Sequence, residues 1–331
     1  VSCWGDNASG QTGNGTTTGD DPFPGPVVDL PLADAVTTGN ETGCALVSGA
    51  VWCWGDNSDG QLVDGTTDDR GSAAQIPGLS GVTAITAGDD HVCALMSDTT
   101  VQCWGDNEDG QLGRGSATST DETPATATGF GSGVTAIDAG NDYTCAVVGG
   151  TTRCVGDGEN GVLGNGSESD ALVPTDVQGL PSGATAISAN EDHVCAIVGG
   201  GAWCWGENSQ GELGRGTATR FEATAAPVVG LPGQVVEISL GDSHTCARTS
   251  DGVGWCWGQA DDGETGTGEL LESATPVPVI GLPDSAGTLE LGGRHSCWVT
   301  DAGPVWCWGD PASLQFIDDE AELPIESSTP Q

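Results

Sequence analysis

The pentapeptide Val101-Gln102-Cys103-Trp104-Gly105 decides the fold of this chain, because related segments recur seven times along its 331 residues. Successive copies lie 50 to 52 residues apart, as their cysteines show: Cys3, Cys53, Cys103, Cys154, Cys204, Cys256 and Cys307. A second cysteine precedes six of these by nine or ten residues: Cys44, Cys93, Cys145, Cys195, Cys246 and Cys297. Self-similarity at this period indicates stacked or radially arranged supersecondary units that share a core.

One copy, taken over residues 82–134, contains four short segments typical of β-strands. Residues 82–88 alternate and are rich in β-branched side chains, residues 91–96 and 101–105 follow after turns, and residues 124–130 follow a glycine-rich loop. Four antiparallel strands per ~50 residues are typical of a propeller blade. The sequence therefore predicts an all-β fold, a single β-propeller domain over residues 1–331 with seven four-stranded blades, one of them incomplete. We expect a partial blade at residues 1–33 and repeats that start near residues 34, 82, 134, 184, 235 and 287.

The two cysteines of each pair fall on neighbouring strands of a hairpin. Between Cys44 and Cys53, eight residues accommodate a two-residue turn at Ser48-Gly49, which places the cysteines opposite each other. Directly opposed Cβ atoms lie near the separation that a disulfide needs, whereas zinc sites favour closer C-x2-C spacings. We therefore predict one disulfide within each of the six blades that have a cysteine pair. Each would contribute roughly 2–3 kcal/mol by the chain-entropy model.

Charge and cysteine content limit the partners and the compartment. Acidic residues outnumber basic ones by 48 to 7, and the formal net charge is −41. Such a field repels phosphate backbones, so we expect no nucleic-acid binding. Self-repulsion largely disappears at about 1 M salt, where the Debye length is roughly 3 Å, which favours a halophilic or marine bacterium as the source. Paired cysteines indicate an extracellular or cell-surface location, with the periplasm as a further option, and no apolar stretch is long enough for membrane insertion.

The histidines and tryptophans follow the repeat. All four histidines precede a cysteine by two residues: His91, His193, His244 and His295. Equivalent positions of a propeller lie on a wide circle, too far apart for a shared metal ion with ligands at about 2.1 Å. We therefore expect each histidine to form hydrogen bonds within its own blade. Tryptophans flank the cysteines, as in Trp203-Cys204-Trp205, and strand alternation puts them on the face opposite the cysteine, where they would pack between blades.

No catalytic motif accompanies these residues. The sequence has no nucleophile elbow, phosphate loop or zinc-protease motif, so we assign no catalytic, cofactor-binding or metal-binding residue and expect no enzyme activity. Residues 56–60, Asp-Asn-Ser-Asp-Gly, lack the spacing and the distal glutamate of a calcium loop. Weak Ca²⁺ binding by acidic loops stays open.

Two motifs give the chain a family resemblance. Trp104 to Gly115 fits W-G-x-N-x-x-G-Q-L-G-x-G, and Gly88 to Leu95 fits G-x-x-H-x-C-A-L. These segments resemble the regulator of chromosome condensation repeat family, and the resemblance extends over essentially the whole chain. It implies a seven-bladed propeller but not one function, since family members include nucleotide exchange factors, a plant ultraviolet photoreceptor and a secreted β-lactamase inhibitor. Acidity and paired cysteines favour the secreted bacterial type.

One blade is incomplete in this sequence. Seven copies of ~51 residues would need about 26 residues more than the chain contains. The chain starts on the third strand of a blade, and the expected partner of Cys3 falls in the absent piece. Three interpretations are open: further residues precede Val1, a strand from another subunit fills the gap, or six blades close the ring and leave a displaced tail. Cys3 is accordingly predicted to be unpaired or to form an intermolecular disulfide.

In a repeat protein the positions that differ between copies are candidates for contact with partners. They are Arg153, Arg220, Phe221, Trp298, Leu314 and Phe316. We expect a non-enzymatic extracellular or cell-surface binding or assembly module, such as an adhesion or filament subunit. The alternative is a secreted inhibitor of a partner enzyme, and a third option is a polysaccharide-acting propeller enzyme. The expected partner is a protein, including a second copy of the chain, and a glycan is a further option.

Overall fold

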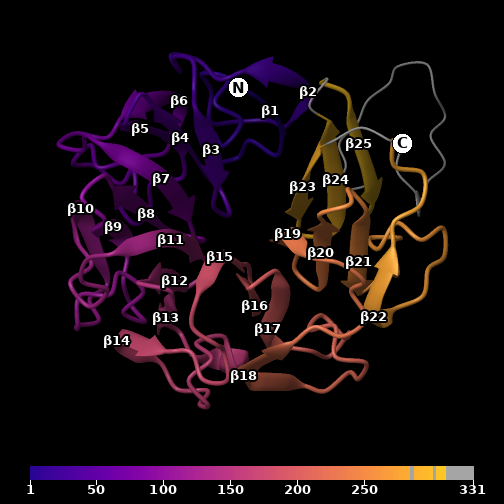
Figure 1. Cartoon of the computed structure of the whole chain (residues 1–331). Helices are drawn as coiled ribbons and strands as arrows, with labels where there is room; N and C mark the ends of the chain where they lie inside the picture. The colour runs from indigo at the N-terminus through magenta and orange to yellow at the C-terminus, as the bar shows by residue number, and fades with distance from the viewer. Residues whose placement is uncertain (284–286, 301–302, 311–331) are drawn as a thin grey trace. The chain divides into compact units, whose positions relative to one another are not determined.

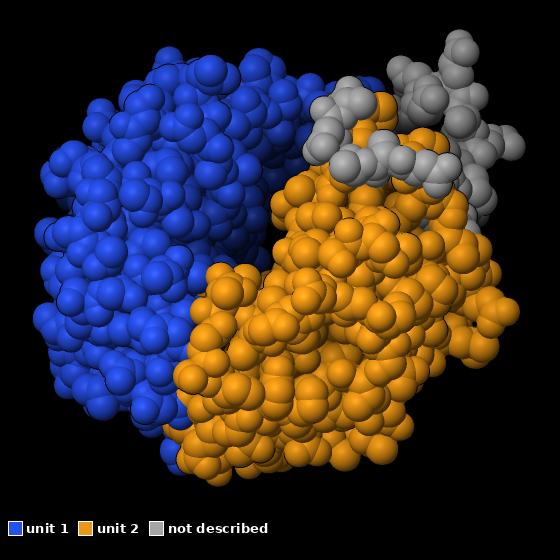
Figure 2. Space-filling model, in the orientation of Figure 1, with its two compact units in different colours: residues 1–158, 169–176 blue, residues 159–168, 177–331 orange. Residues whose placement is uncertain are grey.

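A computed structural model describes residues 1–283, 287–300 and 303–310, and it consists of antiparallel β-sheets in chain order (Figure 1). The chain divides into two compact units: Val1–Gly158 with Ser169–Asp176, and Glu159–Glu168 with Val177–Gln331 (Figure 2). Each sheet is a propeller blade, which confirms the all-β propeller prediction. In the part of the chain that the structure describes, no helix has the length and apolar character needed to cross a membrane.

Unit 1 contains one two-stranded sheet followed by three four-stranded sheets. The strands are β1 (Ser2–Gly5) and β2 (Asp21–Pro26); β3 (Ala35–Thr38), β4 (Thr42–Val47), β5 (Ala50–Gly55) and β6 (Arg70–Gln75); β7 (Val82–Ala87), β8 (His91–Met96), β9 (Val101–Asp106) and β10 (Thr120–Thr126); β11 (Val134–Ala139), β12 (Tyr143–Val148), β13 (Thr151–Gly156) and β14 (Ala171–Asp176). In each four-stranded sheet we call these strands first to fourth. By the repeat pattern, β1 and β2 are a third and a fourth strand.

Unit 2 contains two four-stranded sheets and, within the described residues, one three-stranded sheet. Its elements are η1 (Glu159–Gly161); β15 (Ala184–Ala189), β16 (His193–Val198), β17 (Gly201–Glu207) and β18 (Phe221–Pro227); β19 (Val235–Leu240), β20 (His244–Thr249), β21 (Gly254–Gly258) and β22 (Ser273–Pro278); β23 (Gly287–Gly292), β24 (His295–Thr300) and β25 (Val305–Gly309). The predicted repeat starts near residues 34, 82, 134, 184, 235 and 287 lie at or beside the beginnings of first strands.

The six predicted disulfides are present, each between the second and third strands of its sheet. The bonded cysteines are direct partners across the hairpin, with Cα atoms 4.1 Å apart. Eleven of the twelve side chains are buried and that of Cys297 is partly exposed, so the disulfides lie in the core of the blades.

Turn geometry explains why some cysteine pairs are separated by nine residues and others by ten. In the nine-residue pairs both turn residues have positive φ, as at Ser48 (50°) and Gly49 (82°), which is the two-residue turn preferred by twisted hairpins. The ten-residue pairs have one longer turn, with a positive φ at Thr99 (69°) or Gly252 (88°). The extra residue is absorbed in the turn, and the cysteines keep the same register.

Candidate functional site

In several sheets the loop after the third strand is organised by one buried asparagine. Asn57 Oδ1 accepts a hydrogen bond from the Leu62 N–H at 2.8 Å, and its Nδ2 donates to the Thr66 carbonyl at 2.8 Å. Asn107 and Asn208 repeat this arrangement in their own loops. The repeated Asn of the motif is therefore a structural residue that satisfies the backbone of a tight loop.

Glutamine in the same loop connects neighbouring sheets. Gln61 Nε2 donates to Asp56 at 2.6 Å in its own sheet and reaches Asp90, before β8 in the next sheet, at 3.5 Å. Gln111 connects Asp106 at 2.6 Å and Asp142 at 3.4 Å in the same way. Each amide thus lies between two carboxylates that would otherwise repel each other across the boundary between blades.

These carboxylates belong to a continuous acidic group in unit 1, which we call the acidic row: Asp56, Asp59, Asp89, Asp90, Asp106, Asp109, Asp142 and Asp157. Burial raises the pKa of Asp90, and together with the neighbouring carboxylates, Asp59 first among them, it brings this pKa to about 7. Burial and neighbouring aspartates likewise raise the pKa of Asp142 to about 6. The row therefore holds more negative charge than its own hydrogen bonds neutralise, and a cationic group would relieve this repulsion.

Unit 2 differs at the glutamine position. Glu212 and Glu264 occupy it, and both side chains are buried. Before the next second strand, where Asp90 and Asp142 stand in unit 1, unit 2 has Ser243 and Arg294 respectively. In unit 2, therefore, an acid at the glutamine position accompanies a neutral or basic residue before the second strand of the next sheet. Burial raises the pKa of Glu212 to about 7 and also raises the pKa of Glu264.

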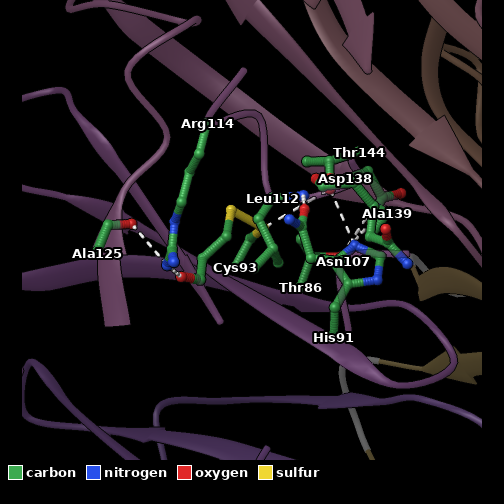
Figure 3. Close-up of a disulfide and its surroundings, with 12 residues drawn as sticks. Thr86, His91, Cys93, Asn107, Leu112, Arg114, Ala125, Asp138, Ala139 and Thr144 are labelled. Carbon is green, nitrogen blue, oxygen red and sulfur yellow. Dashed lines mark hydrogen bonds between the residues drawn. A yellow bond between two sulfur atoms is a disulfide. The ribbon is translucent and has the colours of Figure 1, made fainter. Parts of the chain in front are cut away.

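Three of the four histidines connect blades, which corrects for them the expectation that they bond within a blade. His91 on β8 lies 2.9 Å from Thr144 Oγ1 on β12 of the next sheet (Figure 3). Thr144 donates in turn to the Gln111 carbonyl at 2.9 Å. His193 and His244 make the corresponding contacts, at 2.8 Å, with hydroxyls 52 residues further along. Local spacing could not identify these partners because they belong to the following repeat. Burial lowers the pKa of His91 to about 4, so the ring is neutral at ordinary pH.

The tryptophans that follow the third-strand cysteines also connect blades, as predicted. Trp104 Nε1 donates to the Gln61 carbonyl of the preceding sheet at 2.8 Å, and Trp257 Nε1 donates to the Glu212 carbonyl at 2.6 Å. Both indoles are fully buried. They are therefore part of the core and are not available to stack on a sugar.

Each of the seven arginines forms an ion pair with an acidic side chain. The candidate contact residue Arg153 pairs with Asp176 at 2.7 Å, and Arg220 lies 3.5 Å from Glu168 with its guanidinium 5.1 Å from the centre of the Phe221 ring. The positive charge of each arginine is therefore neutralised by a nearby carboxylate, and the remaining acidic side chains give the surface its excess of negative charge.

The remaining candidate contact residues are not surface groups of the described structure. Trp298 on β24 is 1 % exposed and belongs to the core with Leu289 and Trp306, which corrects its assignment as a contact residue. It fills the place that alanine takes after the second-strand cysteine in other sheets, such as Ala94. Leu314 and Phe316 lie outside the described residues.

The acidic loops are not arranged as a metal site. Within residues 1–283, 287–300 and 303–310, no three His, Cys, Asp or Glu side chains are grouped to hold a metal ion. Asp56, in the loop that faintly resembles a calcium site, accepts hydrogen bonds from Ser58 and Gln61. What the arrangement offers chemically is a concentration of carboxylates on loops held by a disulfide-bonded scaffold.

Comparison with known proteins agrees with this architecture. The human protein WBSCR16 superposes with a TM-score of 0.84 at 19 % identity, covering 100 % of this chain and 92 % of its own. Prp20p from Saccharomyces cerevisiae gives a TM-score of 0.85 at 20 % identity, covering 99 % of this chain and 84 % of its own. At this level of identity the two structures establish the shared fold.

Sequence relatives match shorter segments. The mitochondrial RCC1 domain-containing protein RUG3 of Arabidopsis thaliana is 30 % identical over 92 residues, which is 27 % of this chain and 21 % of the relative. The ultraviolet-B receptor UVR8 of the same plant is 38 % identical over 77 residues, 23 % of this chain and 17 % of the receptor. The matched segments thus span about a fifth of each relative's length.

Family models cover more of the chain. The regulator of chromosome condensation (RCC1) repeat matches residues 48–95, 100–147, 154–197 and 199–248, and a second model of the same repeat matches residues 82–111 and 235–264. These matches include more than half of the sequence, and each match of the first model runs from the third strand of one sheet to the second strand of the next. The chain belongs to the regulator of chromosome condensation (RCC1) repeat family.

Proposed function

We propose that this chain is a non-enzymatic extracellular or cell-surface module that binds a basic protein partner through the acidic row of unit 1. The observation that carries the proposal is the uneven use of charge: every arginine pairs with an acid, while eight aspartates gather on neighbouring loops. Complementary charge speeds association and selects partners, and it favours a cationic surface here.

Relatives support a binding role. The structure of Prp20p is described together with its binding to Gsp1p and histones, and a further relative is a retinitis pigmentosa GTPase regulator. In this chain the repeated His, Trp, Asn and Gln residues are occupied in holding blades and loops together. Loops presented by a rigid scaffold are the usual location of binding residues in such folds.

The disulfides support a location outside the cytosol. Twelve cysteines form six pairs, five of them fully buried, and structural disulfides persist in oxidising compartments. The test is thiol alkylation of the protein isolated from its source without reductant, followed by intact mass measurement. We expect no alkylation of these twelve cysteines, and their alkylation in the untreated protein would refute the proposed location.

Binding through the acidic row is tested with a defined cationic probe. The probe is a twelve-residue peptide of alternating arginine and serine, and the reference peptide carries glutamate in place of arginine. We expect the double variant Asp59→Asn with Asp109→Asn to bind the arginine peptide at least threefold more weakly at 0.05 M salt. The control, Asp20→Asn with Glu269→Gln, removes the same charge at exposed positions outside the row. Equal weakening by both double variants would show that net charge alone is responsible.

A further inference from the structure

The fourth strand of each four-stranded sheet contains a bulge beside the third strand. In β14, residues 172–174 lie between the paired residues Ala171 and Thr175, opposite the single residue Val155 of β13. The same irregularity occurs in β6, β10, β18 and β22. A bulge turns side chains out of the regular alternation of a strand, and bulges are frequent at sheet edges and next to active sites. Because β14 is the edge strand of its sheet, its bulge is presented at the margin of the blade (Figure 1).

The bulge of β14 carries two exposed aliphatic side chains. Leu172 is 41 % exposed and Val173 is 56 % exposed. In the other four-stranded sheets the same two positions hold small, polar or charged residues: Gly71 and Ser72, Glu122 and Thr123, Ala223 and Thr224, Ala274 and Thr275. The blade fold therefore does not require aliphatic residues at these positions.

The aliphatic pair lies against a loop of the acidic row. The Leu172 carbonyl accepts a hydrogen bond at 2.9 Å from the N–H of Gly115, which ends this loop in the preceding sheet. A Cβ atom at Gly110 would lie only 2.7 Å from Leu172 Cδ2, so the leucine side chain packs on the loop backbone there. Asp109 of the acidic row comes directly before Gly110. The aliphatic pair and the acidic row are therefore parts of one surface of unit 1.

Two carboxylates beside the pair are not neutralised by arginine. Burial raises the pKa of Asp109, and the charges of Asp170 and Glu108 raise it in the same direction, so Asp170 lies near Asp109. All seven arginines of the chain form their ion pairs with other acids. The surface at β14 thus combines aliphatic side chains with negative charge.

We propose that Leu172 and Val173 are a docking site for a segment of a partner protein in which apolar side chains of leucine size are flanked by arginine or lysine. The apolar side chains cover the aliphatic pair, and the cationic groups lie at Asp109 and Asp170. Removal of apolar surface from water supplies affinity, and complementary charge excludes acidic segments. The proposal rests on the binding role proposed above and deepens it: the acidic row attracts basic partners, and the aliphatic pair selects among them.

A second copy of this chain does not fit this description. Its formal net charge of −41 sets two negative surfaces against each other. The chain has adjacent exposed leucines at Leu270 and Leu271, but glutamates flank them, at Glu269 and Glu272. The site at β14 calls for the opposite charge on either side of the apolar residues, which a different protein must supply.

The experiment measures the affinity of the whole chain for two matched peptides at 0.05 M salt. The probe peptide is Arg-Ser-Arg-Ser-Arg-Leu-Leu-Arg-Ser-Arg-Ser-Arg, and the reference peptide has Ser-Ser in place of Leu-Leu with the same six arginines. We expect the parent chain to bind the leucine peptide about fivefold more tightly, because the leucines and the aliphatic pair remove each other's surface from water. The leucine peptide should also give new hydrogen-exchange protection to the amides of residues 171–173.

The test variant is Leu172→Ser with Val173→Thr. It installs the kinds of residue that other sheets have in the same bulge, so the blade retains a structure that the fold already uses. We expect this variant to lose the preference for the leucine peptide and to bind the serine peptide as tightly as the parent chain. The matched control, Leu270→Ser with Val229→Thr, makes the same chemical changes at comparably exposed positions of unit 2 and should keep the preference.

Several results would overturn the proposal. A preference that survives in the test variant, or that falls equally in the control, would place the apolar contact elsewhere. Equal affinity for a leucine peptide with glutamate in place of arginine would remove the role of charge. Self-association of the parent chain at 1 M salt, abolished in the test variant, would identify a second copy as the occupant.

Failure of this inference is distinguishable from failure of the proposed function. A parent chain that binds the serine peptide but shows no preference for leucine contradicts the aliphatic docking site alone. A parent chain that does not bind the serine peptide contradicts binding through the acidic row, on which the docking site rests.

Discussion

Replacing Glu212 with glutamine should stabilise unit 2 at alkaline pH and leave it unchanged in acid. Glu212 is 1 % exposed and takes the motif position of Gln61 and Gln111, whose amide groups donate to a loop aspartate at 2.6 Å. Glu207 occupies the place of that aspartate, so two carboxyls meet where unit 1 has an amide and a carboxylate. Glu212 can donate the hydrogen bond that glutamine donates in unit 1 only when its carboxyl group is protonated.

The magnitude follows from the proton affinity of the carboxyl. Burial raises the pKa of Glu212 to about 7, against roughly 4.3 in an unfolded chain. Between these values the folded state binds more protons than the unfolded state, so the contribution of Glu212 to stability falls as the pH rises from about 4 to about 7. Above pH 7 the cost is constant, at about 4 kcal/mol by the relation of roughly 1.4 kcal/mol per tenfold change in affinity. Glutamine is neutral throughout and removes that cost.

The assay is urea unfolding followed by tryptophan fluorescence at a fixed 1 M salt concentration, from pH 4 to pH 8.5. We expect Glu212→Gln to raise the free energy of unfolding by about 3–4 kcal/mol at pH 8.5 and by under 0.5 kcal/mol at pH 4. Glu108→Gln, which removes an exposed carboxylate from another loop, controls for the change in net charge. A stability difference that is the same at both pH values, or larger in acid, would refute the reasoning.

Three further predictions concern the bonds between and within blades. His244→Gln should reduce the loss of stability on acidification below about pH 6.5, because burial lowers the pKa of His244 to about 3 and the unfolded chain therefore takes up this proton first. Urea unfolding between pH 7 and pH 4.5 measures the difference, and a free energy of unfolding that falls with pH as steeply as in the parent chain would contradict it. Thr144→Val should destabilise unit 1 by about 1–3 kcal/mol, since His91 loses its hydroxyl partner in the core. Thr18→Val at an exposed position is the control, and a loss of stability no greater than in this control would exclude a role for the His91–Thr144 hydrogen bond. The double variant Cys93→Ser with Cys103→Ser should lower the free energy of unfolding by about 2–3 kcal/mol or more, measured under the same non-reducing conditions, and stability equal to the parent chain would show that the bridge does not constrain the unfolded state.

Much of the fold could be predicted because its determinants are local and repeated. Strand alternation, glycine turns and the nine- or ten-residue cysteine spacing act within about fifteen residues, so one hairpin fixes its own register and its own disulfide. The prediction that tryptophans pack between blades was also confirmed, because both faces of a blade are covered by neighbours.

The candidate site depended on contacts that no local pattern contains. The partners of the histidines lie 52 or 53 residues away, and the burial of Trp298 depends on how β24 packs against its neighbours. The crowding that raises the pKa of Asp90 likewise involves aspartates from different sheets. A repeat identifies equivalent positions along the chain, but it does not show which of these residues contact each other in the folded protein.

By itself the sequence determined the blades, their strand register and the six disulfides, since each follows from side-chain alternation and turn geometry along a short stretch of chain. Only the tertiary structure decided which polar groups are buried and which carboxylates face each other. The physical reason is that desolvation and Coulomb interactions depend on distances between side chains of neighbouring sheets, and packing sets those distances.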